Sequence, residues 1–320
     1  MSQFLSNCTA DAMASAAEHL IAGDLVAFPT ETVYGLGADA SNSKAVARIY
    51  SVKGRPSDHP LIVHVASMDR MGDWASDVPE YAIKLARDFW PGPMTLVLKR
   101  SELASDFVTG GQDTVGVRVP DHVVALALLE AFEKAGGKGV AAPSANRFGH
   151  VSPTTAAAVV EELADYLSQD DLVLDGGACG VGVESTIINC MGDIPRILRP
   201  GAITEEMIEH STGLDVLGTD GVAIRVSGLL ESHYSPIAKV ILDQSPIVGQ
   251  GFIAMADVAS GAGVVRLAAP RTHEEFARVL YSALRAADHQ GLDTIMVAQP
   301  AGNGIAIAIR DRLKRAACLE

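Results

Sequence analysis

Apolar and polar residues recur with two different periods along the first two-thirds of the chain, and this alternation predicts an α/β domain. Short apolar runs predict strands at 25–28, 61–65, 94–98, 115–119, 139–142, 172–174, 186–189 and 196–198. Helical periodicity predicts one helix between Thr9 and Gly23 and others at 43–52, 80–89, 123–134 and 154–167. Because several strands follow one another without a helix between them, we expect a twisted sheet of mixed direction.

The last third of the chain has a separate pattern. Residues 213–238 show no clear period and end in the sequence HYSP, which indicates a linker. Beyond it, strands are predicted at 239–242, 251–255, 263–267 and 294–298, with helices at 272–289 and 305–317. The expected organisation is therefore a first α/β domain over 1–212, a linker over 213–238 and a small α/β, Rossmann-like domain over 239–320.

Composition adds the expected environment of the protein. Of the 320 residues, 48% are hydrophobic, which is ample for two cores. No uncharged apolar run reaches about 18 residues, and residues 1–10 lack the basic start and apolar stretch of a signal peptide, so we expect a cytoplasmic protein and no membrane partner. The four cysteines are scattered without a C-x-x-C pair and are interpreted as reduced structural residues, which leaves any metal ligand unknown.

The charge distribution limits the ligands. The net charge is −14, and residues 216–320 carry ten basic and ten acidic residues, so the whole acidic excess lies in residues 1–215. A broad acidic surface repels a phosphate backbone, so tight direct RNA binding is not expected. An anionic ligand would need a local cluster of bases, with a divalent cation offsetting its charge.

Two of the predicted strands share one arrangement of polar residues. In residues 61–65, period-two alternation turns the leucine and valines to one face and His64 to the other. In residues 115–119 and the position before them, three valines face one way, while Thr114, a glycine and Arg118 face the other. A satisfied core histidine and a surface salt bridge are the ordinary explanations. An arginine opposite a glycine nevertheless destabilises a strand unless it has a partner.

Other segments place polar groups at strand ends. Residues 28–37, FPTETVYGLG, offer hydroxyls and bare glycine backbone, although an ordinary turn explains them as well. Lys53 and Arg55 flank a glycine before a strand, which suits phosphate oxygens. Residues 141–154, AAPSANRFGHVSPT, form a polar loop that suits an anion or ribose and leads into a helix capped by Ser152 or Thr154. Helix capping alone explains Ser152 equally well.

Two further segments near residue 200 are less specific. Residues 175–186, DGGACGVGVEST, are rich in glycines that let backbone approach a ligand, and Arg199 is another cation at a strand end. A glycine-rich turn alone is weak evidence for a site. No G-x-x-x-x-G-K-[ST] pattern occurs in the sequence, which excludes a P-loop.

The order and spelling of these segments resemble the YrdC-like family of threonylcarbamoyl-AMP synthases. The matching motifs are PTETVYGLG, KGRP with PLIVHV, WPGPMTLVL, TVGVRVP, APSAN followed by SPT, GVESTI and LRPG. The match spans residues 24–202, and HYSP with the later GNGIA resembles the two-domain form of the family. The resemblance implies a twisted α/β sheet curved around a concave, basic site.

The resemblance also implies roles for the matching residues. Threonine would be surrounded by Thr32, His64, Arg118, Ala142 and Ser185, with Arg118 on its carboxylate. ATP would be bound by Arg55, His59, Thr114, Ser144, Ser152, Arg199 and Tyr234. The catalytic residues would be Lys53, Arg55, Ser144 and Asn146, in the family's K-x-R and S-x-N patterns. His59 stands where the family usually has asparagine, and its imidazole can still donate a hydrogen bond.

The implied reaction converts L-threonine, bicarbonate and ATP to threonylcarbamoyl-AMP and pyrophosphate, with Mg²⁺ accompanying the nucleotide and no organic cofactor. The product would pass to a tRNA-modifying threonylcarbamoyl transferase complex, and the linker with the second domain would cover the site. One rival is carbamoyl-adenylate chemistry, whose proteins resemble larger assemblies with zinc-finger cysteines that this chain lacks. The other is a non-catalytic RNA-binding module, against which the acidic first domain counts.

Overall fold

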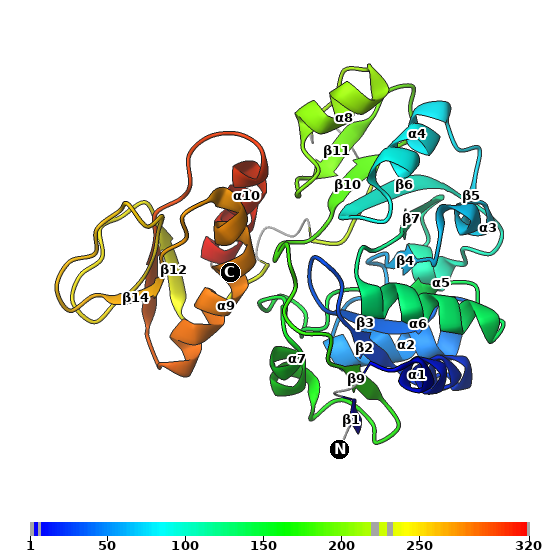
Figure 1. Ribbon diagram of the computed structural model, residues 1–320, viewed down its shortest axis with the longest axis horizontal. Coiled ribbons are helices and arrows are strands. Elements are labelled where there is room, and N and C mark those ends of the chain that lie inside the picture. Colours follow the sequence, from blue (N-terminus) through cyan, green and yellow to red (C-terminus); the bar gives the residue numbers. More distant parts are fainter. Residues whose placement is uncertain (1–2, 6–7, 219–223, 229–232, 319–320) are drawn as a thin grey trace.

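The computed structural model describes residues 3–5, 8–218, 224–228 and 233–318, which form two α/β domains (Figure 1). The larger contains a twisted mixed sheet of 11 strands among these residues, in the order β1-β9-β2-β3-β8-β4-β7-β6-β10-β11 with β5 beside β6. Its strands are β1 (Gln3–Leu5), β2 (Val26–Phe28), β3 (Gly35–Asp39), β4 (Ile62–His64), β5 (Ala75–Ser76), β6 (Met94–Arg100), β7 (Thr114–Arg118), β8 (Val140–Ala141), β9 (Leu172–Leu174), β10 (Thr186–Asn189) and β11 (Arg196–Arg199). The mixed direction agrees with the prediction.

Helices of the first domain cover the sheet. They are α1 (Ala10–Ala22), α2 (Ser43–Lys53), α3 (Met71–Trp74), α4 (Glu80–Phe89), α5 (Asp106–Thr109), α6 (Val123–Lys134), α7 (Ala156–Leu163) and α8 (Glu205–Thr212), with a 3₁₀ turn at Met68–Arg70. Helix α1 begins and ends as predicted, because the Thr9 hydroxyl accepts a hydrogen bond from the Ala12 amide and Gly23 ends the helix in a left-handed conformation. Its buried face packs with α6 against β2.

The second domain is a parallel sheet of four strands among the described residues, in the order β12-β15-β13-β14. Its elements are β12 (Lys239–Leu242), β13 (Gly251–Ile253), β14 (Val265–Ala268), α9 (His273–His289), β15 (Thr294–Val297) and α10 (Ile305–Ala317). Helices α9 and α10 lie on the side that faces the first domain (Figure 1). The predicted boundaries at 212 and 239 stay a prediction, and residues 219–223 and 229–232 of the predicted linker lie outside the described residues.

Strands β4 and β7 pair in parallel, in a register that sets the polar positions of one strand opposite the polar positions of the other. Ile62 lies opposite Gly116, and His64 lies opposite Arg118. The valines of both strands are buried in the main core, so the polar members of the pair share the other face. The alternation predicted from the sequence is confirmed, and it places His64 and Arg118 side by side.

The glycine segment after β2 differs from the prediction, because residues 35–39 form strand β3 instead of a loop. β3 is antiparallel to both β2 and β8. A side-chain carbon at Gly37 would lie 2.8 Å from Phe28 and 2.8 Å from Val140. Gly37 is therefore required by close packing of three strands, and not by a ligand.

The predicted cap of the helix after residue 154 is also different. Thr155 caps α7 by accepting a hydrogen bond from the Ala158 amide. The hydroxyl of Ser152 instead donates to the carboxylate of Glu184, at 2.6 Å. The polar loop therefore contributes one capping residue and one residue that belongs to a different network.

Candidate active site

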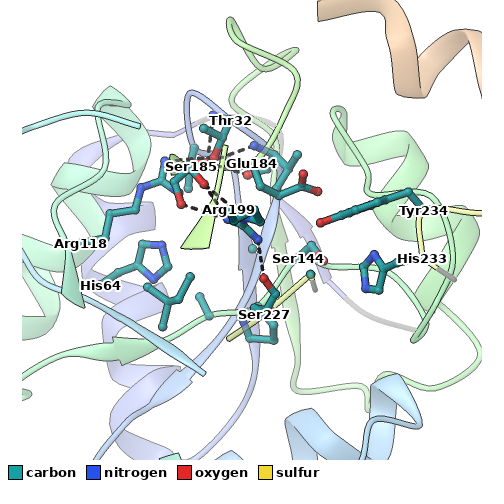
Figure 2. A pocket seen from close by; sticks show the side chains of 17 residues that line it. Thr32, His64, Arg118, Ser144, Glu184, Ser185, Arg199, Ser227, His233 and Tyr234 are labelled. Atoms are coloured by element: carbon teal, nitrogen blue, oxygen red, sulfur yellow. Dashed lines mark hydrogen bonds between the residues drawn. The ribbon is translucent and has the colours of Figure 1, made fainter. Parts of the chain in front are cut away.

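A cavity lies between the first domain and the linker (Figure 2). The space between its lining side chains, counted together with the open solvent at its mouth, is about 470 Å³. The predicted site residues in its wall are Thr32, His64, Arg118, Ala142, Ser144, Ser185, Arg199 and Tyr234. The predicted residues outside its wall are Lys53, Arg55, His59, Thr114, Asn146 and Ser152. All of the residues expected around threonine thus face one space.

His64 lines this cavity, and its imidazole is neutral. Burial, and then the charge of Arg118, lower the pKa of His64 to about 3. Its Nδ1 is buried without a hydrogen-bond partner among the described residues. A neutral imidazole can donate or accept one hydrogen bond there, which suits a substrate hydroxyl.

Arg118 is held at one end by two residues of the turn after β2. Its Nη2 donates to the Thr32 hydroxyl at 3.0 Å and lies 2.6 Å from Oε1 of Glu31. Its Nε is buried and finds no acceptor within the part of the chain that the structure describes. A guanidinium with an unused N–H beside a cavity is suited to a carboxylate ligand.

Arg199, at the end of β11, connects Ser185, the residue before β10, to Ser227 of the linker. Its Nη2 donates to the Ser185 carbonyl at 2.9 Å, and its Nη1 donates to the Ser227 carbonyl at 2.9 Å. Burial lowers the pKa of Arg199 from its usual value. Because Ser185 also contacts the hydroxyl of Thr95 at 2.8 Å, the arginine and the serine form a fixed polar edge of the cavity.

Lys53 lies behind the polar loop that follows β8. Its Nζ donates to the carbonyls of Ser144 and Asn146, at 2.6 Å and 2.5 Å. The Asn146 amide nitrogen donates in turn to the carbonyl of His150 at 2.9 Å. Burial, and then Arg55, lower the pKa of Lys53 well below its usual value. In this geometry Lys53 fixes the loop that presents Ser144.

Replacing Lys53 with methionine should therefore loosen the loop. The variant Lys53→Met keeps the apolar stem but leaves two buried carbonyls unpaired, which costs about 1–3 kcal/mol each in unfolding free energy. We expect a clear loss of activity together with a lower urea midpoint. Lys84→Met, which removes an exposed lysine paired with Asp88, is the control and should change neither. Normal activity in Lys53→Met would contradict the loop's role.

A cluster of rings connects the KGRP loop to the linker. The ring of Phe148 packs edge-on against His59, with centroids 5.4 Å apart, and against His233, with centroids 6.2 Å apart. The guanidinium of Arg55 lies over Phe148 at 5.8 Å, and its Nη2 donates to the Pro60 carbonyl at 2.9 Å. Burial lowers the pKa of Arg55 to about 10, so it stays charged at neutral pH.

A second, smaller cavity lies next to the first. It has an empty volume of about 300 Å³, and Thr114 opens into it together with apolar residues of the sheet face. The linker covers it, because the side chain of Gln112 donates to the Arg225 carbonyl at 2.9 Å and accepts from the Arg225 amide at 2.7 Å. Ile62 and Ser227 line both cavities, so the two cavities adjoin where the linker passes strand β4.

The end of the linker turns Tyr234 into the first cavity. Tyr234 adopts a left-handed conformation with φ 63° and stacks on Tyr281 of α9 at a centroid distance of 5.6 Å. Its hydroxyl is buried and has no hydrogen-bond partner among the described residues. A side-chain carbon at Gly228 would lie 2.3 Å from that hydroxyl, so only glycine fits where the linker passes it.

Glu184 connects the cavity wall to the second domain. Its carboxylate accepts hydrogen bonds from Ser152, from Tyr281 at 2.9 Å and from Arg312 Nε of α10 at 2.8 Å. Burial alone would raise the pKa of Glu184, but Arg312, Arg199 and these hydrogen bonds outweigh it and lower the pKa to about 2. The carboxylate is therefore charged and fixed at neutral pH.

Sequence reasoning missed several residues of this site. Glu31 and Glu184 stand directly beside predicted residues in PTET and GVEST, and a carboxylate next to hydroxyl residues at the end of a buried strand could have indicated them. His233 also lines the cavity, one position before Tyr234. No motif or spacing in the sequence indicates Ser227, because it reaches the cavity only when the linker folds back over the first domain.

Comparison with known proteins identifies both parts of the chain. A family model described as "Telomere recombination" (Sua5_yciO_yrdC) matches residues 18–201. A second model, described as the C-terminal domain of threonylcarbamoyl-AMP synthase, matches residues 203–318. The two matches divide the chain at the end of the first sheet.

Individual relatives agree with the models. Threonylcarbamoyl-AMP synthase of Pyrococcus abyssi is 40% identical over 92% of this chain and 90% of its own length. The protein of that name from Bacillus subtilis is 41% identical over 95% of this chain and 92% of its own. The crystal structure of P. abyssi Sua5 complexed with L-threonine superposes with a TM-score of 0.87 at 37% identity, covering 99% of this chain and 97% of that one.

These matches, with the fold and the cationic cavity, define a transferase-type enzyme that uses ATP. The chain belongs to the threonylcarbamoyl-AMP synthase family, in its two-domain form. Among the described residues, no helix is long and apolar enough to cross a membrane.

Proposed function

We propose that the two neighbouring cavities divide the substrates of threonylcarbamoyl-AMP synthesis between them. The first takes L-threonine, with its carboxylate on Arg118 and its hydroxyl near the neutral His64, enclosed by Thr32, Ala142 and Ser185. The observation that carries this assignment is the in-phase pairing of β4 and β7, which sets His64 beside Arg118 at the cavity wall. The relative whose structure contains L-threonine has the same overall fold.

ATP would span the second cavity and the edge of the first. The apolar surface around Thr114 suits the adenine ring. The phosphates would lie towards Arg55 and Arg199, with Lys53 and Asn146 behind the loop that presents Ser144. In the structure Arg55 and Arg199 contact Ser227, so nucleotide binding at these arginines requires the linker segment to move. Contacts from His59, Ser152 and Tyr234 to the nucleotide are part of the same proposal.

The chemistry needs little covalent help from the protein. The threonine amine and bicarbonate give a carbamate and water, and a carbamate oxygen then forms a bond to the α-phosphorus of ATP as the bond to pyrophosphate breaks. The chain's contribution is alignment of the two substrates and stabilisation of charge by Arg55 and Arg199. No serine or cysteine is required as a nucleophile.

Magnesium would arrive with the nucleotide, without a site of its own on the protein. Among the described residues, no three His, Cys, Asp or Glu side chains are grouped so that they could hold a metal ion. The carboxylates beside the cavity, Glu31 and Glu184, already face Arg118 and Arg312. A magnesium ion bound mainly by phosphates and water fits this arrangement, and no step is assigned to a resident metal.

The test is pyrophosphate release from ATP and magnesium, with L-threonine or bicarbonate omitted in turn. We expect release only in the complete mixture, together with threonylcarbamoyl-AMP detected by mass spectrometry. Release that is independent of threonine, or that depends on carbamoyl phosphate, would contradict the proposal.

The product would pass in the cytoplasm to a tRNA-modifying threonylcarbamoyl transferase complex. A gel shift at physiological salt should show no tight binding of RNA by this chain.

A further inference from the structure

Glu31 contacts Arg118 but does not itself line the cavity. Its Oε1 is 2.6 Å from Nη2 of Arg118, and both side chains are almost fully buried. Glu31 is not in the cavity wall, whereas Arg118 is. The contact is an ion pair without an aligned hydrogen bond, since both carboxylate oxygens are free of hydrogen-bond partners in the described parts of the chain.

The backbone keeps Glu31 in this position. The Thr30 hydroxyl donates to the Val33 carbonyl at 2.7 Å and accepts from the amides of Thr32 and Val33, which closes a tight turn around Glu31. On the other side, the Val181 amide donates to the Glu31 carbonyl at 2.7 Å. The backbone of Glu31 is thus anchored on both sides of the residue, so the side chain starts from a fixed position and can restrain Arg118.

The other titratable groups near Glu31 do not offer a competing cation. Burial lowers the pKa of His122, and the charge of Glu31 only partly opposes that shift. Burial, and then Glu31, raise the pKa of the Cys179 thiol to about 12, so it stays protonated. Among the described residues, Arg118 is the only cation that forms a salt bridge with Glu31.

The two contacts at Nη2 define the orientation of the guanidinium. An arginine has five N–H groups in one plane, and recognition of a carboxylate depends on the direction of that plane. Glu31 and Thr32 both engage Nη2, while Nε remains unpaired at the other end of the same group. The protein therefore holds one end and leaves the rest for a ligand.

We infer that Glu31 is a positioning residue for recognition of the amino-acid carboxylate: from outside the cavity it orients Arg118 so that the free edge of the guanidinium meets the substrate. This inference rests on the proposed function, in which Arg118 binds the carboxylate of threonine. Its consequence is that the effect of removing Glu31 depends on whether the ligand has a carboxylate.

The experiment compares two ligands by calorimetry on the full chain: L-threonine and L-threoninamide, in which an amide replaces the carboxylate. In Glu31→Ala we expect the affinity for L-threonine to fall by about tenfold or more. A loss of this size corresponds to roughly one charge-assisted hydrogen bond. L-threoninamide should change by less than about twofold, because it makes no ion pair with Arg118. Glu31→Gln, which keeps the shape of the side chain, should show a smaller change in the same direction.

A control and three outcomes make the test decisive. Asp171→Asn removes a buried carboxylate that pairs with Arg48 at 2.7 Å and lines neither cavity, and it should leave both affinities unchanged. Equal weakening of both ligands in the Glu31 variants would mean a merely structural role and overturn the inference. Unchanged or tighter threonine binding would overturn it too. If the unmodified chain fails to prefer threonine over threoninamide, the proposed function itself falls.

Discussion

Replacing Arg118 with alanine should raise the threonine concentration needed for half-maximal activity by about 100-fold or more. Arg118 is buried, and its ligand-facing edge has no other acceptor among the described residues. Truncating one partner of a buried charge pair costs about 2–5 kcal/mol, and every 1.4 kcal/mol is about a tenfold change. The variant Arg118→Ala also leaves Glu31 without its cation, which adds a loss of stability.

Pyrophosphate release measured against threonine concentration, and separately against ATP concentration, checks this prediction. The KM for ATP should change by less than about threefold, because Arg118 does not line the second cavity, into which Thr114 opens. Arg100→Ala removes a more exposed arginine that pairs with Asp106 and is the matched control. An unaltered threonine dependence in Arg118→Ala would place the carboxylate elsewhere.

The sheet and its polar face could be predicted because they depend on local periodicity. Alternation along β4 and β7 assigned His64 and Arg118 to the face opposite the valines, and the core confirms it. Helices α4 and α6 begin and end as predicted, since the apolar residues of each recur with helical period and form one buried face. Such features are determined within ten to fifteen residues of sequence.

The segment that became β3 shows where local reasoning fails. Gly35 and Gly37 are typical of a turn, and the sequence around them is rich in hydroxyls. The neighbouring strands β2 and β8 decide the outcome, because they pair with it on both sides and leave no room for a larger side chain at Gly37. Tertiary packing therefore overrides a turn-like composition.

Contacts across the domain boundary could not be predicted at all. Glu184 and Arg312 are 128 positions apart, and neither residue has a periodicity that relates it to the other. The linker is a similar case, since Ser227 and Tyr234 reach the cavity only because the chain folds back over it. The role predicted for Tyr234 came from the resemblance to a known family, because no periodicity or spacing in the sequence indicates it.

Removing Arg312 should have the largest effect on stability. Its side chain is fully buried and pairs with Glu184, and it also donates to the Pro200 carbonyl at 3.0 Å. In Arg312→Ala the carboxylate of Glu184 stays buried without its main cation, which costs about 3–5 kcal/mol of unfolding free energy. Activity should fall as well, because Glu184 lines the cavity next to Ser185. Lys314→Ala, which removes an exposed cation from the same helix, is the control and should cost only about 0–0.5 kcal/mol.

The pH dependence of the unfolding free energy distinguishes the ion pair between Arg312 and Glu184 from the packing that is also lost in Arg312→Ala. The pKa of Glu184 is lowered to about 2 from an ordinary value of 4.5, so the pair stabilises the native state fully above about pH 4.5. That stability is lost as the pH falls from 4.5 towards 2, because the unfolded chain takes up the proton first. Urea unfolding between pH 7 and 3 should therefore show a steep acid decline in the unmodified protein and a flatter one in Arg312→Ala. Parallel curves for the two proteins would show that Arg312 stabilises the interface by packing alone.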